Sequence, residues 1–173
     1  QRKHARFVNT GMMVTLSGAV VSDGLEDGTV VSGVGGQYNF VAMAHSLSDA
    51  RSILCVRSTR GGGKDLLSNI MPHYGHITIP RHLRDIIVTE YGIADLRSKT
   101  DEEIAIALIQ VADSRFQEAL LGDMKSKGKV REDYVIPALY NQNYPEKLTS
   151  LLNTWRAKGY FPAFPLGSDF TDE

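Results

Sequence analysis

The segment VVSGVGGQYNF, residues 30–40, places three glycines, Gly33, Gly35 and Gly36, between two apolar runs. β-Branched residues precede the glycines and predict a strand over 29–33. Apolar residues at helical spacing follow them and predict a short helix over 37–47. Glycine permits positive φ angles and close approach of the backbone to a ligand, and anions often bind where a strand passes through such a turn into a helix. The segment therefore predicts either a tight structural turn or a backbone cradle for an anionic group.

Composition narrows the classes of protein and partner. With 173 residues and 42% hydrophobic content, the chain suits one globular domain or a large part of one. The net charge is -1, so the chain lacks the excess of positive charge that favours binding to nucleic acid or an anionic membrane. No apolar window is long enough to span a bilayer, and no signal peptide is visible. The single cysteine, Cys55, fits a reducing compartment, so we expect a cytoplasmic location.

The two ends suggest a piece of a longer polypeptide. The chain starts at Gln1 within a basic run rather than at a methionine, and it stops at DFTDE. We therefore expect a preceding domain of the same polypeptide. The aromatic tail over 160–170 is expected to pack on an apolar surface. A cut domain with an apolar tail also favours self-association, so a homodimer is possible.

Alternating strands and helices give way to helices along the chain. Strand patterns over 5–23, 51–58, 76–80 and 85–92 surround the glycine segment. Thr100 and Glu103 form a capping-box pattern, Asp113 is a second helix cap, and Pro145 opens a third helix that runs to Lys158. This order predicts an α/β fold with an open, mostly parallel sheet flanked by helices. We expect an α/β domain over 1–112, and a helical extension with an aromatic tail packing on it over 113–173.

Three familiar motifs fail on inspection. The nicotinamide fingerprint needs a third glycine where Tyr38 stands, so no nicotinamide is expected. The run STRGGGK resembles a phosphate loop but has Ser58 in place of its first glycine and Asp65 in place of the magnesium-binding Ser or Thr. The loop histidines His73 and His76 have no carboxylate beside them in sequence, so no metal is expected.

Glu90 is the candidate catalytic carboxylate. It ends the strand DIIVTE and is followed by an aromatic residue and a glycine. In open α/β sheets, ligands bind at this edge. Two structural interpretations stay open beside the functional one: Glu90 caps the following turn, or it pairs with an arginine such as Arg97.

Taken in order, four segments resemble one family. SGVGGQYNFV, STRGGGK, the Pro-Arg-His segment at 80–82 and VTEYGIADLRSKT are similar to the C-terminal domain of the acetyl-CoA hydrolase/transferase family, a class I CoA-transferase group. The resemblance covers about residues 7–116, and TEYGIADLR is its most specific part. The tail resembles that of longer family members.

The resemblance implies transfer of coenzyme A from an acyl-CoA to a carboxylate or to water. A glutamate side chain would attack the thioester and form a glutamyl-CoA intermediate. By the resemblance, the Gly36 amide stabilises the oxyanion, while Gly33, Val34 and Gly35 shape the loop and contact coenzyme A. Glu90 would shape a loop, and the nucleophilic glutamate would lie upstream of this chain.

By the same resemblance, a cation in the TRGGGK loop would contact the phosphates of coenzyme A. Both Arg60 and Lys64 are candidates, and Lys64 is favoured, although a solvated loop charge is an equal alternative. Two other classes of function stay open. The chain could be a non-catalytic module that binds coenzyme A or a nucleotide, or a sugar-phosphate isomerase-like enzyme. The isomerase needs an acid/base pair facing a phosphate loop, and the sequence offers no convincing pair.

Overall fold

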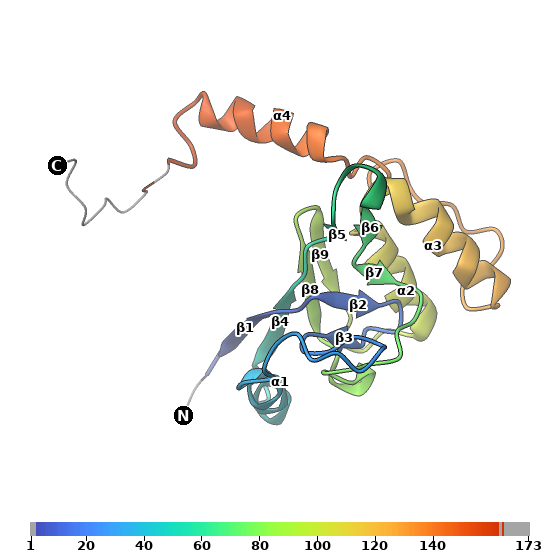
Figure 1. Cartoon of the computed structure of the whole chain (residues 1–173). Coiled ribbons are helices and arrows are strands. Elements are labelled where there is room, and N and C mark those ends of the chain that lie inside the picture. The colour runs from blue at the N-terminus through green and yellow to red at the C-terminus, as the bar shows by residue number, and fades with distance from the viewer. Residues whose placement is uncertain (1–2, 163, 165–173) are drawn as a thin grey trace.

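The computed structural model describes residues 3–162 and 164. Its elements, shown in Figure 1, are β1 (Arg6–Thr10), β2 (Met13–Thr15), β3 (Val20–Val21), α1 (Gln37–Ser46), β4 (Arg51–Cys55), β5 (Thr59–Arg60), η1 (Gly63–Asp65), β6 (Leu67–Ser68), β7 (Ile70–Met71), η2 (Arg81–Leu83), β8 (Ile86–Thr89), β9 (Gly92–Asp95), α2 (Asp101–Gln110), α3 (Ser114–Ser126) and α4 (Pro145–Arg156).

The main sheet has the strand order β1-β4-β8-β9. Strands β1, β4 and β8 are parallel, and β9 returns antiparallel to β8. A second sheet has the order β3-β2-β7, and β5 and β6 form a separate hairpin. The predicted α/β fold with an open, mostly parallel sheet is confirmed.

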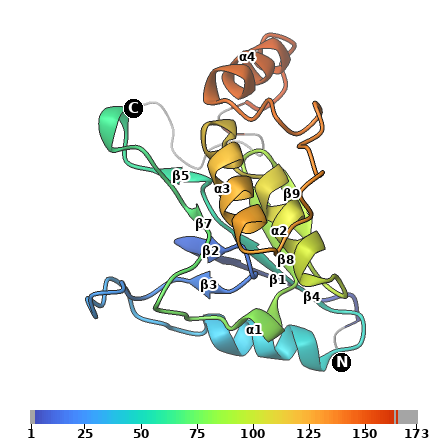
Figure 2. The ribbon, with the colours of Figure 1, turned by 90° about the vertical axis from the view of Figure 1, so that its right-hand side faces the viewer.

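One face of the main sheet is covered by helices. Strand β4 alternates between partly buried and buried side chains, so that Ser52 and Leu54 point into the core. Helix α1 contacts β1 and β4, and α2 contacts β9. Figure 2 shows α2 and α3 lying in front of the sheet. Both helices therefore serve one core, because the period-two pattern of the strands directs apolar side chains to the helical side.

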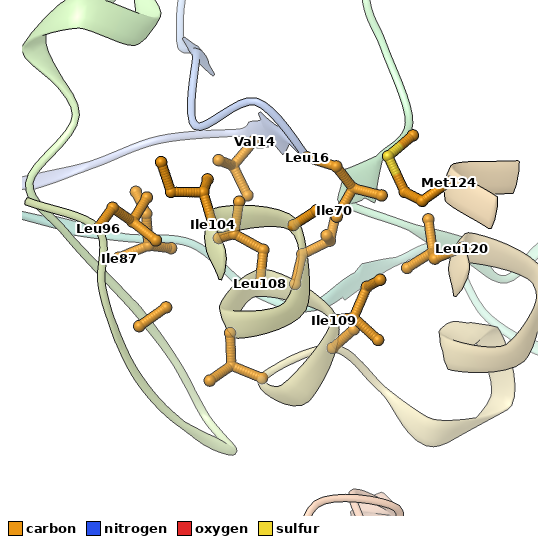
Figure 3. Close-up of a cluster of buried hydrophobic side chains, with 14 of the residues drawn as sticks. Val14, Leu16, Ile70, Ile87, Leu96, Ile104, Leu108, Ile109, Leu120 and Met124 are labelled. Atoms are coloured by element: carbon orange, nitrogen blue, oxygen red, sulfur yellow. The ribbon is translucent and has the colours of Figure 1, made fainter. Parts of the chain in front are cut away.

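Helix α2 forms the middle layer of that core. Its fully buried residues Ile104, Leu108 and Ile109 lie between the two sheets and α3, as Figure 3 shows. On the far side, Leu120 and Met124 of α3 complete the same cluster. The core thus continues beyond residue 112, and the predicted division of the chain at 112/113 stays a prediction.

The predicted helix caps are confirmed. Thr100 and Glu103 form a reciprocal capping box, in which the Glu103 N–H donates to the Thr100 hydroxyl and the Thr100 N–H to the Glu103 carboxylate. The Asp113 carboxylate accepts a hydrogen bond from the Arg115 amide at the start of α3. Gly128, at φ +62°, follows the end of α3 in the left-handed region that favours glycine.

Two predicted strands are wrong. The 29–33 and 76–80 segments form only isolated bridges, between Gly24 and Val30 and between Val20 and Ile79. Val30 is 75% exposed, so its β-branched side chain gains nothing from burial. Ile79, by contrast, is fully buried and exchanges backbone hydrogen bonds with Val20 of β3, but the pairing stops at this single bridge. The glycine segment is therefore a loop that leads into α1.

The chain is clamped to the body just before α4. The Asn143 side-chain amide donates to the carbonyls of Gln110 and Ala112, each at 2.8 Å. The Asn143 amide donates to Ser114 Oγ, and the Ser114 amide donates to the Asn143 carbonyl. Helix α4 itself has no buried residue and stands away from the sheets (Figure 1). It ends at Arg156, two residues before the predicted end.

The predicted packing of the tail falls largely on residues 163 and 165–173, which lie outside the described residues. Within the described part, Tyr160, Phe161 and Phe164 are exposed. No helix among residues 3–162 combines the length and apolar character needed to cross a bilayer.

Replacing Leu108 by alanine tests the central position of α2. Because Leu108 is fully buried, Leu108→Ala should lower the free energy of unfolding by about 2–5 kcal/mol. The matched control Leu151→Ala, on exposed α4, should change it by less than about 0.5 kcal/mol. Urea-induced unfolding of both variants measures the difference, and equal losses would contradict the proposed core.

Candidate functional site

The predicted site residues follow the carboxyl ends of the parallel strands. Strands β1, β4 and β8 end at Thr10, Cys55 and Thr89. The glycine segment leads into α1, whose first residue contacts the end of β1. Figure 2 shows the loop before α1 and the β5–β6 hairpin projecting on the same side of the molecule. This is the edge at which open α/β sheets bind ligands.

The glycine segment presents bare backbone at this edge. Gln37, the first residue of α1, donates through Nε2 to the Thr10 carbonyl at 2.9 Å and so joins the helix to the end of β1. Gly36 is the helix N-cap, without a side-chain cap and without an acidic residue in the first turn. Amide groups at such a helix end are donors for an anion.

Only one of the three glycines in the segment has a backbone conformation that favours glycine. Gly35 has φ +56°, in the left-handed region. A Cβ atom added at Gly33 or Gly35 would meet open space, and one at Gly36 would meet only the Phe40 ring at 3.9 Å. The neighbouring Val34 is also exposed. Within this chain nothing requires a missing side chain at Gly33 or Gly36, so a tight turn accounts for Gly35 alone.

Glu90 joins the ends of two strands. It forms, with Tyr91, the two-residue turn between β8 and β9. Its carboxylate accepts hydrogen bonds from the Ser58 amide at 2.9 Å and from Ser58 Oγ at 2.6 Å. Ser58 is fully buried, whereas Glu90 is exposed. Glu90 therefore holds the segment after β4 in place.

Arg97 is not the partner of Glu90, contrary to one of the sequence interpretations. Its guanidinium donates to the buried carboxylate of Asp85 at 2.6 Å. Asp85 directly precedes β8, so this pair lies at the opposite end of the strand from Glu90. Arg97 follows Glu90 by seven residues, and the extended strand β9 lies between them. Arg97 is therefore far from the turn.

Tyr91 anchors the same turn to α3. Its hydroxyl donates to Asp113 at 3.2 Å, and its amide donates to Thr89 Oγ. Arg115 binds Asp113 with two guanidinium bonds, at 2.8 and 2.6 Å. Burial opposes ionisation of Asp113, but these bonds to Arg115 outweigh it and hold the pKa of Asp113 below its usual value. Burial, and then the Asp113 charge, raise the pKa of Tyr91.

The two predicted phosphate-binding cations differ in freedom. Arg60 is fixed on the β5–β6 hairpin, where its guanidinium donates to the Ser68 carbonyl and to Asn69 Oδ1, each at 2.8 Å. Lys64 is exposed in the hairpin turn. Its ammonium has no hydrogen bond or ion pair among residues 3–162 and 164. The geometry therefore favours Lys64 over Arg60 as the available cation.

Two side chains at this edge that carry buried, unpaired polar atoms were not singled out in the sequence. Asn9 Nδ2 and Gln37 Oε1 are inaccessible to solvent and lack a hydrogen-bond partner in the described part of the chain. Buried polar groups are normally paired, so these two unpaired atoms are exceptions at the ligand edge of the sheet. An amide residue within the apolar run of β1, and one directly after the glycines, are the sequence signals that could have identified them.

His76, one of the two loop histidines, has a structural role. His76 Nε2 lies 2.9 Å from Asp23 Oδ1, and Thr78 also binds Asp23. Hydrogen bonds from Thr78 and then from His76 lower the pKa of Asp23. No group of three or more metal-binding side chains occurs in the described ranges.

These features define an α/β protein whose ligand edge combines a glycine-rich helix start with a strand-end glutamate. Comparison with known families is more specific. Residues 1–124 match the acetyl-CoA hydrolase/transferase C-terminal domain. The chain belongs to this family, and the resemblance found in the sequence is confirmed.

Curated relatives of the chain are CoA-transferases. It is 35% identical over 123 residues to the 4-hydroxybutyrate coenzyme A transferase of Clostridium kluyveri, a match covering 69% of this chain and 28% of the relative. It is 33% identical over 118 residues to a probable butyrate:acetyl-CoA coenzyme A-transferase of Syntrophomonas wolfei, covering 66% of this chain and 26% of the relative. The chain thus spans less than a third of the length of these relatives.

Solved structures agree with this assignment. RipA from Yersinia pestis superimposes with a TM-score of 0.64 at 31% identity, over 72% of this chain and 28% of RipA. The 4-hydroxybutyrate CoA-transferase from Porphyromonas gingivalis has a TM-score of 0.56 at 27% identity, over 70% of this chain and 26% of its own. The fold and the family therefore point to the same class of protein.

Asp113→Asn tests the anchor of the Tyr91 turn through its pH dependence. Because the folded pKa of Asp113 is lowered, its ionised form stabilises the fold above the unfolded value, near 3.9, and this contribution is lost as pH falls through the folded pKa. The stability gap between the wild type and the variant should be largest near pH 7 and shrink below about pH 4. Thermal unfolding at several pH values measures it. A gap that stays constant down to pH 2 would contradict the ionised anchor.

Proposed function

We propose that this chain forms part of the acyl-CoA site of a CoA-transferase that moves coenzyme A between short-chain carboxylates. The observation that carries the proposal is the bare backbone of Gly33–Gly36 at the N-terminus of α1, at the ligand edge of the sheet. A thioester carbonyl can approach such a backbone closely, and its developing negative charge meets amide donors. The whole protein's activity is an inference, because the chain spans less than a third of its relatives.

The reaction proceeds by covalent catalysis. A glutamate carboxylate attacks the thioester carbonyl carbon, and the coenzyme A thiolate leaves to give a mixed anhydride. The thiolate then attacks the glutamyl carbonyl, which releases the original acid as a carboxylate and leaves glutamyl-CoA. An acceptor carboxylate reverses these steps; water in its place would give hydrolysis. Each attack passes through a tetrahedral oxyanion, and we assign the Gly36 amide as one of its donors.

Glu90 is assigned a positioning role. Both of its carboxylate oxygens accept hydrogen bonds from Ser58, so nucleophilic attack would break two bonds that hold the end of β4. The nucleophilic glutamate is accordingly assigned to another part of the polypeptide, facing the glycine segment. Glu90 acts by keeping the segment after β4, and hence the β5–β6 hairpin, in place.

Lys64 is assigned to the phosphates of coenzyme A. It lies in an exposed turn closed by Gly61, whose φ of +73° and close approach to the Asp65 carbonyl exclude a side chain. The turn therefore fixes the backbone that carries Lys64, while Arg60 stabilises the hairpin.

We also propose that the protein is located in the cytoplasm, where coenzyme A esters and carboxylates are available as substrates.

Gly36→Val separates catalysis from simple binding in the intact protein. Since an added Cβ meets only the Phe40 ring at 3.9 Å, the variant should fold. The valine side chain should push the thioester carbonyl away from the residue-36 amide. Losing this oxyanion donor should lower kcat by about 100-fold or more. The control Gly122→Ala, on the open surface of α3, should leave kcat unchanged. A rise in KM with kcat intact would favour a binding module without a catalytic role for this loop.

Mass spectrometry after incubation with acetyl-CoA locates the nucleophile. In the intact protein, a covalent coenzyme A adduct should form on a peptide outside residues 1–173. Glu90→Gln should still form this adduct, but more slowly, because the two Ser58 bonds run to different carboxylate oxygens and the NH2 group that replaces one of them cannot accept. An adduct on Glu90 itself would make it the nucleophile and contradict the positioning role.

A further inference from the structure

Strand β1 has a free edge with unpaired backbone groups. The Arg51 amide donates to the Ala5 carbonyl, and the Gly11 amide donates to the Cys55 carbonyl. In the parallel register of β1 and β4, the odd-numbered residues between them therefore bond to β4. The backbone groups of Arg6, Val8 and Thr10 point to the other side. There the Thr10 carbonyl accepts from Gln37, whereas Val8 has no neighbouring strand in the described structure.

Within residues 6–10, the charge of Arg6 is the one common protection against pairing that this edge has. Natural edge strands are shortened, bulged, charged, interrupted by proline or covered. Strand β1 has five residues, all paired in continuous register with β4, and no proline. Its Val8 side chain is 61% exposed. Such an edge is suited to accept another strand.

Apolar surface continues past β1 on the helical side of the sheet. Phe7 of β1 packs against Phe40 of α1, with ring centroids 5.9 Å apart. Together with Met43 and Leu47, these rings line an open pocket of about 480 Å³. The core on this side therefore ends in an unfilled apolar pocket at the place where a next strand would direct its side chains.

The opposite face of the main sheet is also apolar and carries no helix in the described part of the chain. Strand register places six apolar side chains on it, Val8, Ile53, Cys55, Ile86, Val88 and Ile93, with the polar side chains of Arg6, Thr10, Arg51 and Asp95 at its ends. Ile93 is 70% exposed, and the four central ones are partly buried. Parallel sheets are as a rule covered on both faces, so this surface needs a partner.

We infer that β1 is an internal strand in the intact protein: a strand–helix unit from the remaining part of the same polypeptide pairs with Val8 and covers the Val8–Ile93 face. The inference shares one premise with the proposed function: the intact protein is as long as its relatives, which extend far beyond the matched region. One strand with its connected helix supplies both missing parts. Two copies joined at β1 would bring no helix to this face from residues 3–162, because those residues place none there in either copy.

Hydrogen exchange of the intact protein, resolved to single amides, tests the strand pairing. The Val8 amide should exchange within about tenfold of the Phe7 and Asn9 amides, which bond to β4. Exchange of Val8 at the rate of an unstructured amide, with Phe7 and Asn9 still slow, would overturn the inference. Protection that disappears on dilution to monomers would also overturn it, in favour of a second copy. Protection lost on deletion of residues 160–173 would overturn it in favour of the chain's own tail.

Cys55 reports on the covered face. Under native conditions, its peptide in the intact protein should resist alkylation by a maleimide, and denaturation should restore labelling. A cysteine introduced by Ser126→Cys, at an exposed position on α3, serves as the labelled control. Equal labelling of Cys55 and the control would overturn the covered face. These readouts do not depend on activity, so protection in a protein without transferase activity would refute the proposed function and leave this interface standing.

Discussion

The parallel pairing of β1, β4 and β8 is the constraint on which the candidate site depends. Parallel strands have their carboxyl ends at one edge, so three segments separated by dozens of residues meet there. Short side-chain bonds then fix the segment after each strand: Gln37 joins α1 to β1, and Glu90 joins the end of β8 to the segment after β4. The sheet places these segments, and the polar bonds orient them.

The structure is asymmetric in how it uses its apolar residues. Helix α2 fills the space between the two sheets and α3, so one side of the main sheet carries the hydrophobic core, which ends at the pocket beside Phe7. The other side presents isoleucines and valines without cover in the described part of the chain. A sheet with one face in solvent would alternate apolar and polar residues along such strands. Strands β4 and β8 have apolar residues on both faces, as expected for a sheet that is covered by a layer of helices on each side.

Sequence patterns predicted the parts whose causes are local. The capping box at Thr100, the Asp113 cap and the buried strand after Arg51 depend on neighbouring residues and were found correctly. The supposed strand over 29–33 depended on a distant partner that the pattern does not specify, and it was wrong. For the site, the glycines and Glu90 could be chosen from the sequence, but the Ser58 partner of Glu90 could not. Thirty-two residues separate the two, and only the sheet brings them together.

The turn at Glu90 and Tyr91 receives bonds from two directions. Glu90 reaches the segment after β4, while Tyr91 reaches Asp113 at the start of α3. The next residue, Ser114, is bound to Asn143, from which the exposed helix α4 departs. A continuous mechanical linkage thus runs from α4 through the α3 cap to the glutamate turn. A molecule that held or displaced α4 would apply its force to the ligand edge of the sheet without contacting that edge.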